Sequence, residues 1–187
     1  MIVPAMLLPY LALFTLATVF LSTKTDFFGY IMESVFNSNA WLLLTFFALC
    51  CSIAGAFDII FAVLSIREKR DAVSLAKAAM LIKLIQIPAY TLIFVLGGLL
   101  TIAILTIPFS IGLFLFDCLS VLLTGAVVVI AGVNSIRQGT FKLKDVLPIM
   151  ILQLVFCADV VSSVIFYVML KNAAHKAAEQ NTPTVTG

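Results

Sequence analysis

Charged residues are scarce in this sequence. They make up 11% of the 187 residues, whereas 63% are hydrophobic, and the mean hydropathy is +1.21. A soluble domain of this size carries roughly a quarter charged residues. The composition therefore excludes an ordinary soluble domain and predicts an integral membrane protein. The net charge of +2 is too small to indicate a nucleic-acid-binding protein.

Residues that commonly carry catalytic chemistry are also few. The single histidine, His175, lies in a polar stretch. All the cysteines lie inside apolar runs, at Cys50, Cys51, Cys118 and Cys157. Their spacing indicates neither a disulfide framework nor a metal site, and no zinc-protease or glycine-rich nucleotide motif is present. We therefore expect no enzyme activity, no catalytic residue, no bound metal and no cofactor.

Long apolar runs are abundant, and they predict the fold class. A hydrocarbon core of ~30 Å requires about 20 residues of helix. We predict an all-α, polytopic transmembrane bundle of five spans, at about 2–21, 41–66, 78–100, 109–133 and 146–170. The turn between the third and fourth spans is expected between Gly97 and Pro108. Residues 1–170 are expected to form one transmembrane domain, and residues 171–187 a polar, disordered tail.

Residues 25–37, between the first two spans, have an amphipathic pattern. One helical face is apolar and consists of Phe27, Phe28, Ile31, Met32, Val35 and Phe36. A short helix lying in the membrane interface is expected here. A surface loop with its aromatic side chains folded onto the bundle is the alternative. The first span holds no ionisable side chain, so we expect a peripheral anchor.

Lysines and arginines indicate the orientation. Seven of them fall in the loops after the second and fourth spans: Arg67, Lys69, Arg70, Lys77, Arg137, Lys142 and Lys144. Three fall on the other side: Lys24, Lys171 and Lys176. The positive-inside rule then predicts that the basic loops are cytoplasmic, the N-terminus inside and the C-terminus outside.

A possible internal repeat is limited to one tripeptide. The second and fourth spans both end in Ser-Ile-Arg, at 65–67 and 135–137. The aspartates of the two spans stand at different distances from this tripeptide. Internal duplication is therefore not predicted.

Four ionisable side chains are expected inside the spans: Asp58, Lys83, Asp117 and Asp159. A charged residue in a span is costly, ~3 kcal/mol for an aspartate at its centre, and it usually marks a functional site. A carboxylate at this depth has to be protonated, hydrogen-bonded, hydrated or paired with a cation. Proton relay and cation binding are the functional interpretations. A neutral, hydrogen-bonded aspartate is the structural one.

The third span carries a polar stripe. Lys83, Gln86 and Tyr90 are spaced i, i+3 and i+7, which places them on one helical face. Pro88 has no N–H and disturbs the carbonyl of Leu84, so this carbonyl needs another hydrogen-bond donor.

The depths of the charged side chains suggest how they are grouped. Asp58 and Lys83 have matching depth and opposite charge, so we predict an ion pair that is either an inner gate or a packing element. Asp117 and Asp159 are expected to share one central site that contacts a positive species. The ligand or ion pathway then consists of Asp58, Lys83, Gln86, Tyr90, Asp117 and Asp159.

Two stretches carry a family resemblance. They are Lys-Leu-Ile-Gln-Ile-Pro-Ala-Tyr-Thr-Leu-Ile-Phe at 83–94 and Phe-Ser-Ile-Gly-Leu-Phe-Leu-Phe-Asp-Cys at 109–118. Together they resemble uncharacterised small multi-span membrane proteins of bacteria, over roughly the middle third of the chain. The resemblance implies a location in the bacterial plasma membrane and implies no activity.

Two functions from different classes agree with these features. The first is a small carrier or permeation protein for protons, cations or an amine-bearing solute. The second is a non-transporting accessory, assembly or immunity-type protein whose buried polar residues are structural. The expected partners are the lipid bilayer, a small cation or proton, and a partner protein or a second copy of the chain, but no nucleic acid. A cavity that reaches Asp117 or Asp159 would favour the carrier, and a fully packed centre the accessory protein.

Overall fold

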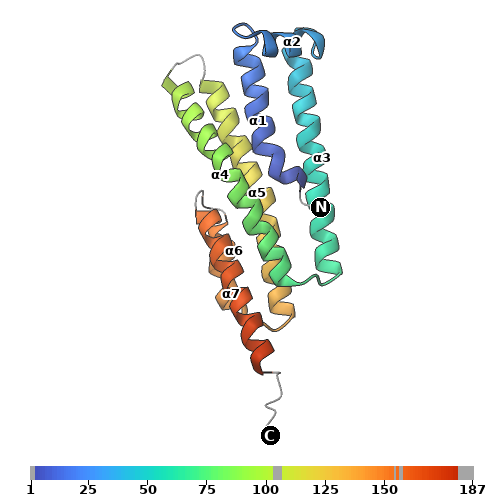
Figure 1. Cartoon of the computed structure of the whole chain (residues 1–187), viewed down its shortest axis with the longest axis vertical. Helices are drawn as coiled ribbons and strands as arrows, with labels where there is room; N and C mark the ends of the chain where they lie inside the picture. The colour runs from blue at the N-terminus through green and yellow to red at the C-terminus, as the bar shows by residue number, and fades with distance from the viewer. Residues whose placement is uncertain (1–2, 103–106, 154, 156–157, 181–187) are drawn as a thin grey trace. The chain divides into compact units, whose positions relative to one another are not determined.

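The computed structural model of the chain describes residues 3–102, 107–153, 155 and 158–180. These residues form seven α-helices and no strand (Figure 1). In chain order the helices are α1 (Val3–Leu21), α2 (Asp26–Ser34), α3 (Ala40–Arg67), α4 (Ala72–Ile102), α5 (Ile107–Arg137), α6 (Leu143–Leu152) and α7 (Ala158–Gln180). The prediction of an all-α chain is confirmed.

Three helices are long and apolar enough to cross a membrane: Ala40–Arg67, Ala72–Ile102 and Ser110–Arg137. They coincide with the second, third and fourth predicted spans. Like Ser110–Arg137, α3 has 28 residues and is shorter than Ala72–Ile102. At ~1.5 Å of rise per residue it is ~42 Å long, which exceeds a hydrocarbon core of ~30 Å. These helices are consistent with a membrane protein.

The chain divides into two compact units, which we describe separately. The first unit is Met1–Ile59 with Ile85–Ser120, and the second is Ile60–Leu84 with Val121–Gly187. The boundaries fall within α3, α4 and α5, so each of these helices contributes residues to both units. The prediction of one transmembrane domain over residues 1–170 stays a prediction.

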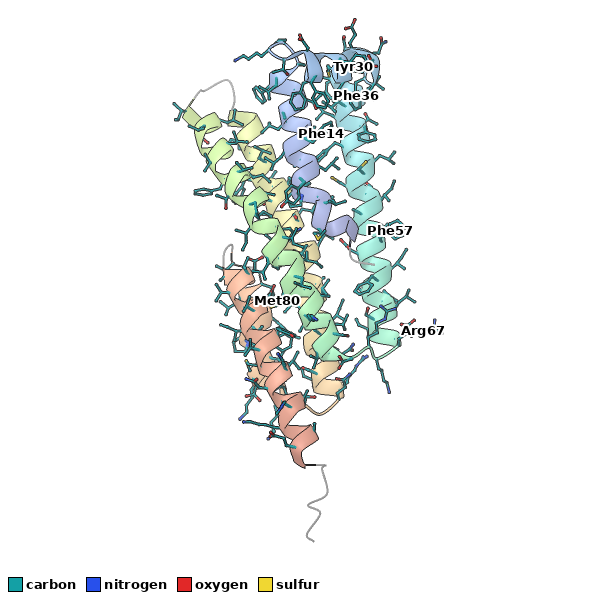
Figure 2. All side chains as sticks on the ribbon, in the orientation of Figure 1. Phe14, Tyr30, Phe36, Phe57, Arg67 and Met80 are labelled. Carbon is teal, nitrogen blue, oxygen red and sulfur yellow. The ribbon has the colours of Figure 1, made fainter. Side chains whose placement is uncertain are left out.

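In the first unit the predicted amphipathic segment forms the short helix α2. The stretches Met6–Leu21 and Asp26–Ser34 meet at 100°, so α2 lies across the ends of α1 and α3 (Figure 1). None of its side chains is fully buried. The Phe28 ring packs against Phe14 with 6.2 Å between centroids. Figure 2 shows that Phe14, Tyr30 and Phe36 gather at this end of the unit. The location of α2 in a membrane interface stays a prediction.

The connection between α4 and α5 is shorter than the sequence predicts. α4 continues through Gly97 to Ile102, and α5 begins at Ile107. The hydroxyls of Thr101 and Ser110 are both within hydrogen-bond distance of the Gly97 carbonyl, at 2.8 Å and 2.9 Å. Pro108 is the second residue of α5. An N–H at this position has no acceptor within the helix, so proline costs no intrahelical hydrogen bond there. Residues that resemble helix breakers are therefore tolerated inside both helices.

In the second unit the two Ser-Ile-Arg tripeptides close their helices in the same way. The N–H five residues after each serine donates to the serine carbonyl, at 3.2 Å for Ser65–Arg67 and 3.0 Å for Ser135–Arg137. One residue of each turn is left-handed, Lys69 with φ 49° and Gly139 with φ 72°. This hydrogen-bond pattern is a common helix C-terminus. The Asn134 side-chain amide donates to two carbonyls of the first turn, each at 3.1 Å.

The predicted fifth span, 146–170, is not a single helix. α6 ends at Leu152 after 10 residues, and α7 begins at Ala158. At ~1.5 Å per residue α6 is ~15 Å long, about half the thickness of a hydrocarbon core. α6 and α7 pack against each other as a helical hairpin (Figure 1). The chain therefore turns back where the sequence predicts a crossing.

The second half of α7 lies beside both basic loops. A cavity of about 390 Å³ is lined by residues 71–73 and 138–140 together with Leu170, Ala173, Ala174 and Ala177. The sequence predicts the C-terminus on the side opposite these loops. The described part of α7 instead lies beside these loops, because the hairpin returns α7 to them, and the membrane side of the C-terminus itself stays a prediction. Residues 171–180 continue α7 instead of forming a tail, and residues 181–187 lie outside the described residues.

Candidate functional site

Lys83 and Asp159 form a buried ion pair in the second unit. Lys83 is on α4, Asp159 is in the first turn of α7, and Lys83 Nζ donates to Asp159 Oδ2. Their side chains are 0% and 2% exposed. The pair is therefore sequestered from solvent, where opposite charges stabilise each other only if further hydrogen bonds satisfy them.

The start of α7 supplies a further hydrogen bond to the carboxylate. Asp159 Oδ1 accepts a hydrogen bond from the Val160 N–H at 2.8 Å. The first N–H groups of a helix have no intrahelical acceptor, and the helix dipole favours a negative charge there. Asp159 is therefore held by the Lys83 ammonium and by the N-terminus of α7.

Gln153 fills the space where the helix is interrupted. Its side chain is buried, and Nε2 donates to Ser162 Oγ at 2.7 Å and to the Asp159 carbonyl at 3.4 Å. Ser163 Oγ donates to the same carbonyl at 2.7 Å. Backbone that leaves the helical path in a membrane protein needs such partners, because no water is available in the hydrocarbon. Gln153 is not among the residues predicted for the site, although a lone glutamine in the apolar run 146–170 was the available signal.

Two glycines of α5 allow α6, and Gln153 directly after it, to approach α5 closely. A Cβ atom at Gly125 would lie 3.3 Å from Gln153 Cβ. A Cβ atom at Gly132 would lie 2.5 Å from Met150 Cε and 2.7 Å from Val146 Cγ1. Larger residues at either position would displace α6, so these glycines help to position Gln153.

The pair lies deep in the second unit. Lys83 is eleven residues from the start of α4 at Ala72, which corresponds to ~16 Å along the helix. The ~15 Å length of α6 places the start of α7 at a similar distance from the basic loop that precedes Leu143. The two charged residues are therefore matched in depth when this depth is measured from the basic loops.

The predicted ion pair between Asp58 and Lys83 is wrong. Lys83 pairs with Asp159, and no ion pair of Asp58 occurs among the described residues. Asp58 is half-buried on α3 in the first unit, and its Oδ2 has no hydrogen-bond partner in that part of the chain. The error has two causes: α4 starts at Ala72, six residues before the predicted span, and the hairpin brings Asp159 to the depth of Lys83.

The other two members of the predicted stripe lie in the first unit. Gln86 is fully buried and Tyr90 is 6% exposed. Tyr90 Oη donates to Gln86 Oε1 at 3.1 Å and lies 3.2 Å from Ser120 Oγ on α5. The side chains of the stripe are therefore buried, which their spacing on one helical face does not by itself predict.

A donor from another helix reaches the α4 backbone one residue from the carbonyl named above, and an external donor to the Leu84 carbonyl itself stays a prediction. Tyr10 Oη of α1 donates to the Ile85 carbonyl at 2.6 Å. The sequence predicts an unmade bond at the carbonyl of Leu84, four residues before Pro88. α1 thus bonds directly to the α4 backbone and does more than anchor the chain.

Asp117 lines a separate cavity in the first unit. It is 8% exposed, and the cavity measures about 240 Å³. The other lining residues come from α4 and α5: Ile93, Phe94, Gly97, Gly98, Thr101, Ser110, Leu113 and Phe114. Asp117 and Asp159 belong to different units, so a shared central site stays a prediction.

Metal ligands are not clustered in the part of the chain that the structure describes. No group of three or more histidine, cysteine, aspartate or glutamate side chains there could hold a metal ion. Cys50, Cys51 and Cys118 are free thiols, and Cys157 lies outside the described residues.

Comparison of the chain with known protein families, with curated proteins and with solved structures finds no match. The function therefore has to be argued from the geometry. The second unit offers a buried ion pair that a proton or cation reaching Asp159 would separate. The first unit offers a carboxylate at the wall of a small cavity.

Proposed function

We propose that this chain is a multi-span protein of the bacterial plasma membrane that carries protons, cations or an amine-bearing solute across the bilayer. The observation that carries the proposal is the Lys83–Asp159 pair at the break between α6 and α7. Ionisable residues inside membrane proteins are costly and commonly mark ion pathways. Transporters commonly place such residues where a membrane helix is discontinuous.

In this proposal α6 and α7 form a hairpin that enters the membrane and returns. The basic loops lie in the cytoplasm by the positive-inside rule, and the end of α7 lies with them. The ~15 Å length of α6 then places the pair near the middle of a ~30 Å core. Lys83 and Asp159 thus form the inner gate, the role predicted from the sequence for Lys83 and Asp58.

The Lys83–Asp159 ion pair separates, and the gate opens, when a positive species reaches Asp159. A proton neutralises the carboxylate, and a cation competes with the Lys83 ammonium for the same oxygens. Either event removes the attraction between α4 and the start of α7. The hydrogen bonds from Gln153 join the end of α6 to the first turn of α7. A movement of the α7 N-terminus is therefore transmitted to α6.

The first unit holds a second set of polar residues, which we describe by itself. Asp117 contacts the positive species at its cavity, and Gln86 and Tyr90 continue the polar face of α4. Asp58 lies half-buried on α3 and is a further carboxylate on which a proton can reside. Each of these assignments can be tested by one isosteric substitution.

The experiment is a flux assay with the full chain in vesicles. Protein is reconstituted with a pH-sensitive dye inside, and an imposed proton, sodium, potassium or methylammonium gradient is followed. Wild type should dissipate at least one gradient faster than empty vesicles. Asp159→Asn and Lys83→Met should slow it by at least roughly tenfold, which corresponds to ~1.4 kcal/mol in the barrier.

Glu33→Gln provides the matched control, because Glu33 is an exposed carboxylate on α2. This variant should retain the wild-type flux. A wild-type protein that is folded and incorporated, yet moves none of the four ions, would refute the carrier.

The alternative is an accessory protein that assembles with a partner protein or with a second copy of the chain. The observation that favours it is a set of exposed aromatic side chains on α2 and at the start of α3. Phe27, Tyr30 and Trp41 are 64%, 70% and 78% exposed. Figure 2 labels Tyr30 at this end of the unit. Aromatic residues are enriched in interfaces between proteins and in membrane interfaces. Absence of flux would favour this function.

A further inference from the structure

The cavity beside Asp117 has one acidic wall and several apolar ones. Asp117 is the only charged residue among the described residues that line it. Ile93 and Leu113 contribute aliphatic surface, while Phe94 and Phe114 stand at the opening, 72% and 67% exposed. A ligand that fits has to combine a positive group with an apolar body.

The hydroxyls in the cavity are arranged as acceptors. Thr101 Oγ1 and Ser110 Oγ are both within hydrogen-bond distance of the Gly97 carbonyl and of each other, so one hydroxyl donates to the carbonyl and the other donates either to it or to the first hydroxyl. A lone pair is left to receive a further donor. The two oxygens lie 2.9 Å apart. A primary ammonium group has three N–H donors, which the carboxylate and these oxygens can accept.

The same walls are a poor site for a metal ion. Calcium takes six to eight oxygen ligands and magnesium a near-ideal octahedron. The described residues that line this cavity supply one carboxylate and two hydroxyls, and the others among them are apolar or glycine. Phenylalanine rings instead attract organic cations through their faces.

We infer that this cavity binds a small organic ammonium ion with an aromatic or branched aliphatic body. The volume of about 240 Å³ lies below the roughly 300–1,000 Å³ of drug-sized sites, so the ligand is small. The inference rests on the proposed function and names the class of its solute: the ammonium lies on Asp117, and its body lies between Phe94 and Phe114. The opening between the exposed rings of two membrane helices lets an amphipathic amine enter from the bilayer.

Binding is measured by calorimetry on the full chain in detergent, with 2-phenylethylammonium as the probe. The neutral 2-phenylethanol has the same body, and potassium chloride supplies a cation without one. The wild type should bind the ammonium at least roughly tenfold more tightly than the alcohol. Asp117→Asn should remove this preference, because it keeps the shape of the side chain and deletes its charge.

A second pair of variants tests which cavity the ligand occupies. Each variant places a valine side chain in a different cavity. Gly97 has room for a Cβ, whose nearest contact would be Ser110 Oγ at 3.9 Å. Gly97→Val should therefore fold, occupy the Asp117 cavity and weaken binding at least roughly tenfold. Gly112→Val is the control, since Gly112 has no atom within 4 Å of an added Cβ and lines a different, apolar cavity. It should bind like the wild type.

Equal affinity for the ammonium and the alcohol would overturn the inference, as would undiminished ammonium binding by Asp117→Asn. Flux of protons or potassium without ammonium binding would refute this site and leave the proposed carrier standing. Ammonium binding that depends on Asp117, without flux of any ion, would refute the carrier and leave the site standing.

Discussion

The Lys83–Asp159 pair makes a quantitative prediction about stability. Both side chains are almost completely buried, so removing one partner leaves the other charge without its counter-ion. Breaking a buried pair in this way typically costs ~3–5 kcal/mol, whereas replacing both partners is often close to neutral. We therefore expect Lys83→Met and Asp159→Asn each to lower the free energy of unfolding by ~3–5 kcal/mol.

Local geometry refines these values. In Lys83→Met the remaining carboxylate still accepts the Val160 N–H at the α7 N-terminus. A charge in that position gains typically ~0.3–1 kcal/mol from the helix dipole, so the Lys83→Met loss should fall at the lower end of the range. The double variant should lose at least ~2 kcal/mol less than the sum of the single losses, which is the coupling expected for residues in contact.

The assay is equilibrium unfolding of the purified chain by sodium dodecyl sulfate in mixed micelles. Lys77→Met is the matched control, because Lys77 lies on the same helix with an exposed side chain. It should change stability by no more than ~0.5 kcal/mol. If the losses of the two single variants add up in the double variant, Lys83 and Asp159 do not interact, and the site built on them is refuted.

Two further predictions concern the hairpin. In a cysteine-free background, single cysteines are introduced for Lys69, Lys142 and Glu179. All three should react with an impermeant thiol reagent from the same face of the membrane, because the second half of α7 lies beside both loops. Reaction of position 179 from the other face would contradict the hairpin. Gly132→Ala should cost ~1–3 kcal/mol of stability, because its Cβ would lie 2.7 Å from Val146 Cγ1, while Gly55→Ala, with no atom within 4 Å, should be tolerated.

The sequence predicted the long helices well because their signal is local. The apolar runs of α3, α4 and α5 exceed the length of a span, and charged residues follow α3 and α5 in the sequence. The common helical face of Lys83, Gln86 and Tyr90 also followed from their spacing on one helix, and the structure shows that all three are buried. These features depend on residues that are close together in the chain.

The break between α6 and α7 could not be predicted in the same way. Residues 152–158 read Leu-Gln-Leu-Val-Phe-Cys-Ala, with neither glycine nor proline. Their partners are distant in sequence: Gly125 makes room for Gln153, and Lys83 pairs with Asp159. An aspartate is common in the first turn of a helix, but in an apolar run it was interpreted as a residue inside a span. This error, together with the start of α4 at Ala72 instead of residue 78, gives the wrong partner for Lys83.

The break, the aspartate and the lysine depend on one another. A helix that starts away from water leaves N–H groups without acceptors, and the Asp159 carboxylate uses one of them. That carboxylate would be a costly charge without Lys83, and Lys83 would be equally costly without it. Each element therefore offsets the cost of another. In the proposed carrier, a proton or cation that separates the pair also weakens the anchoring of the α7 N-terminus, so binding and movement are coupled at the same residues.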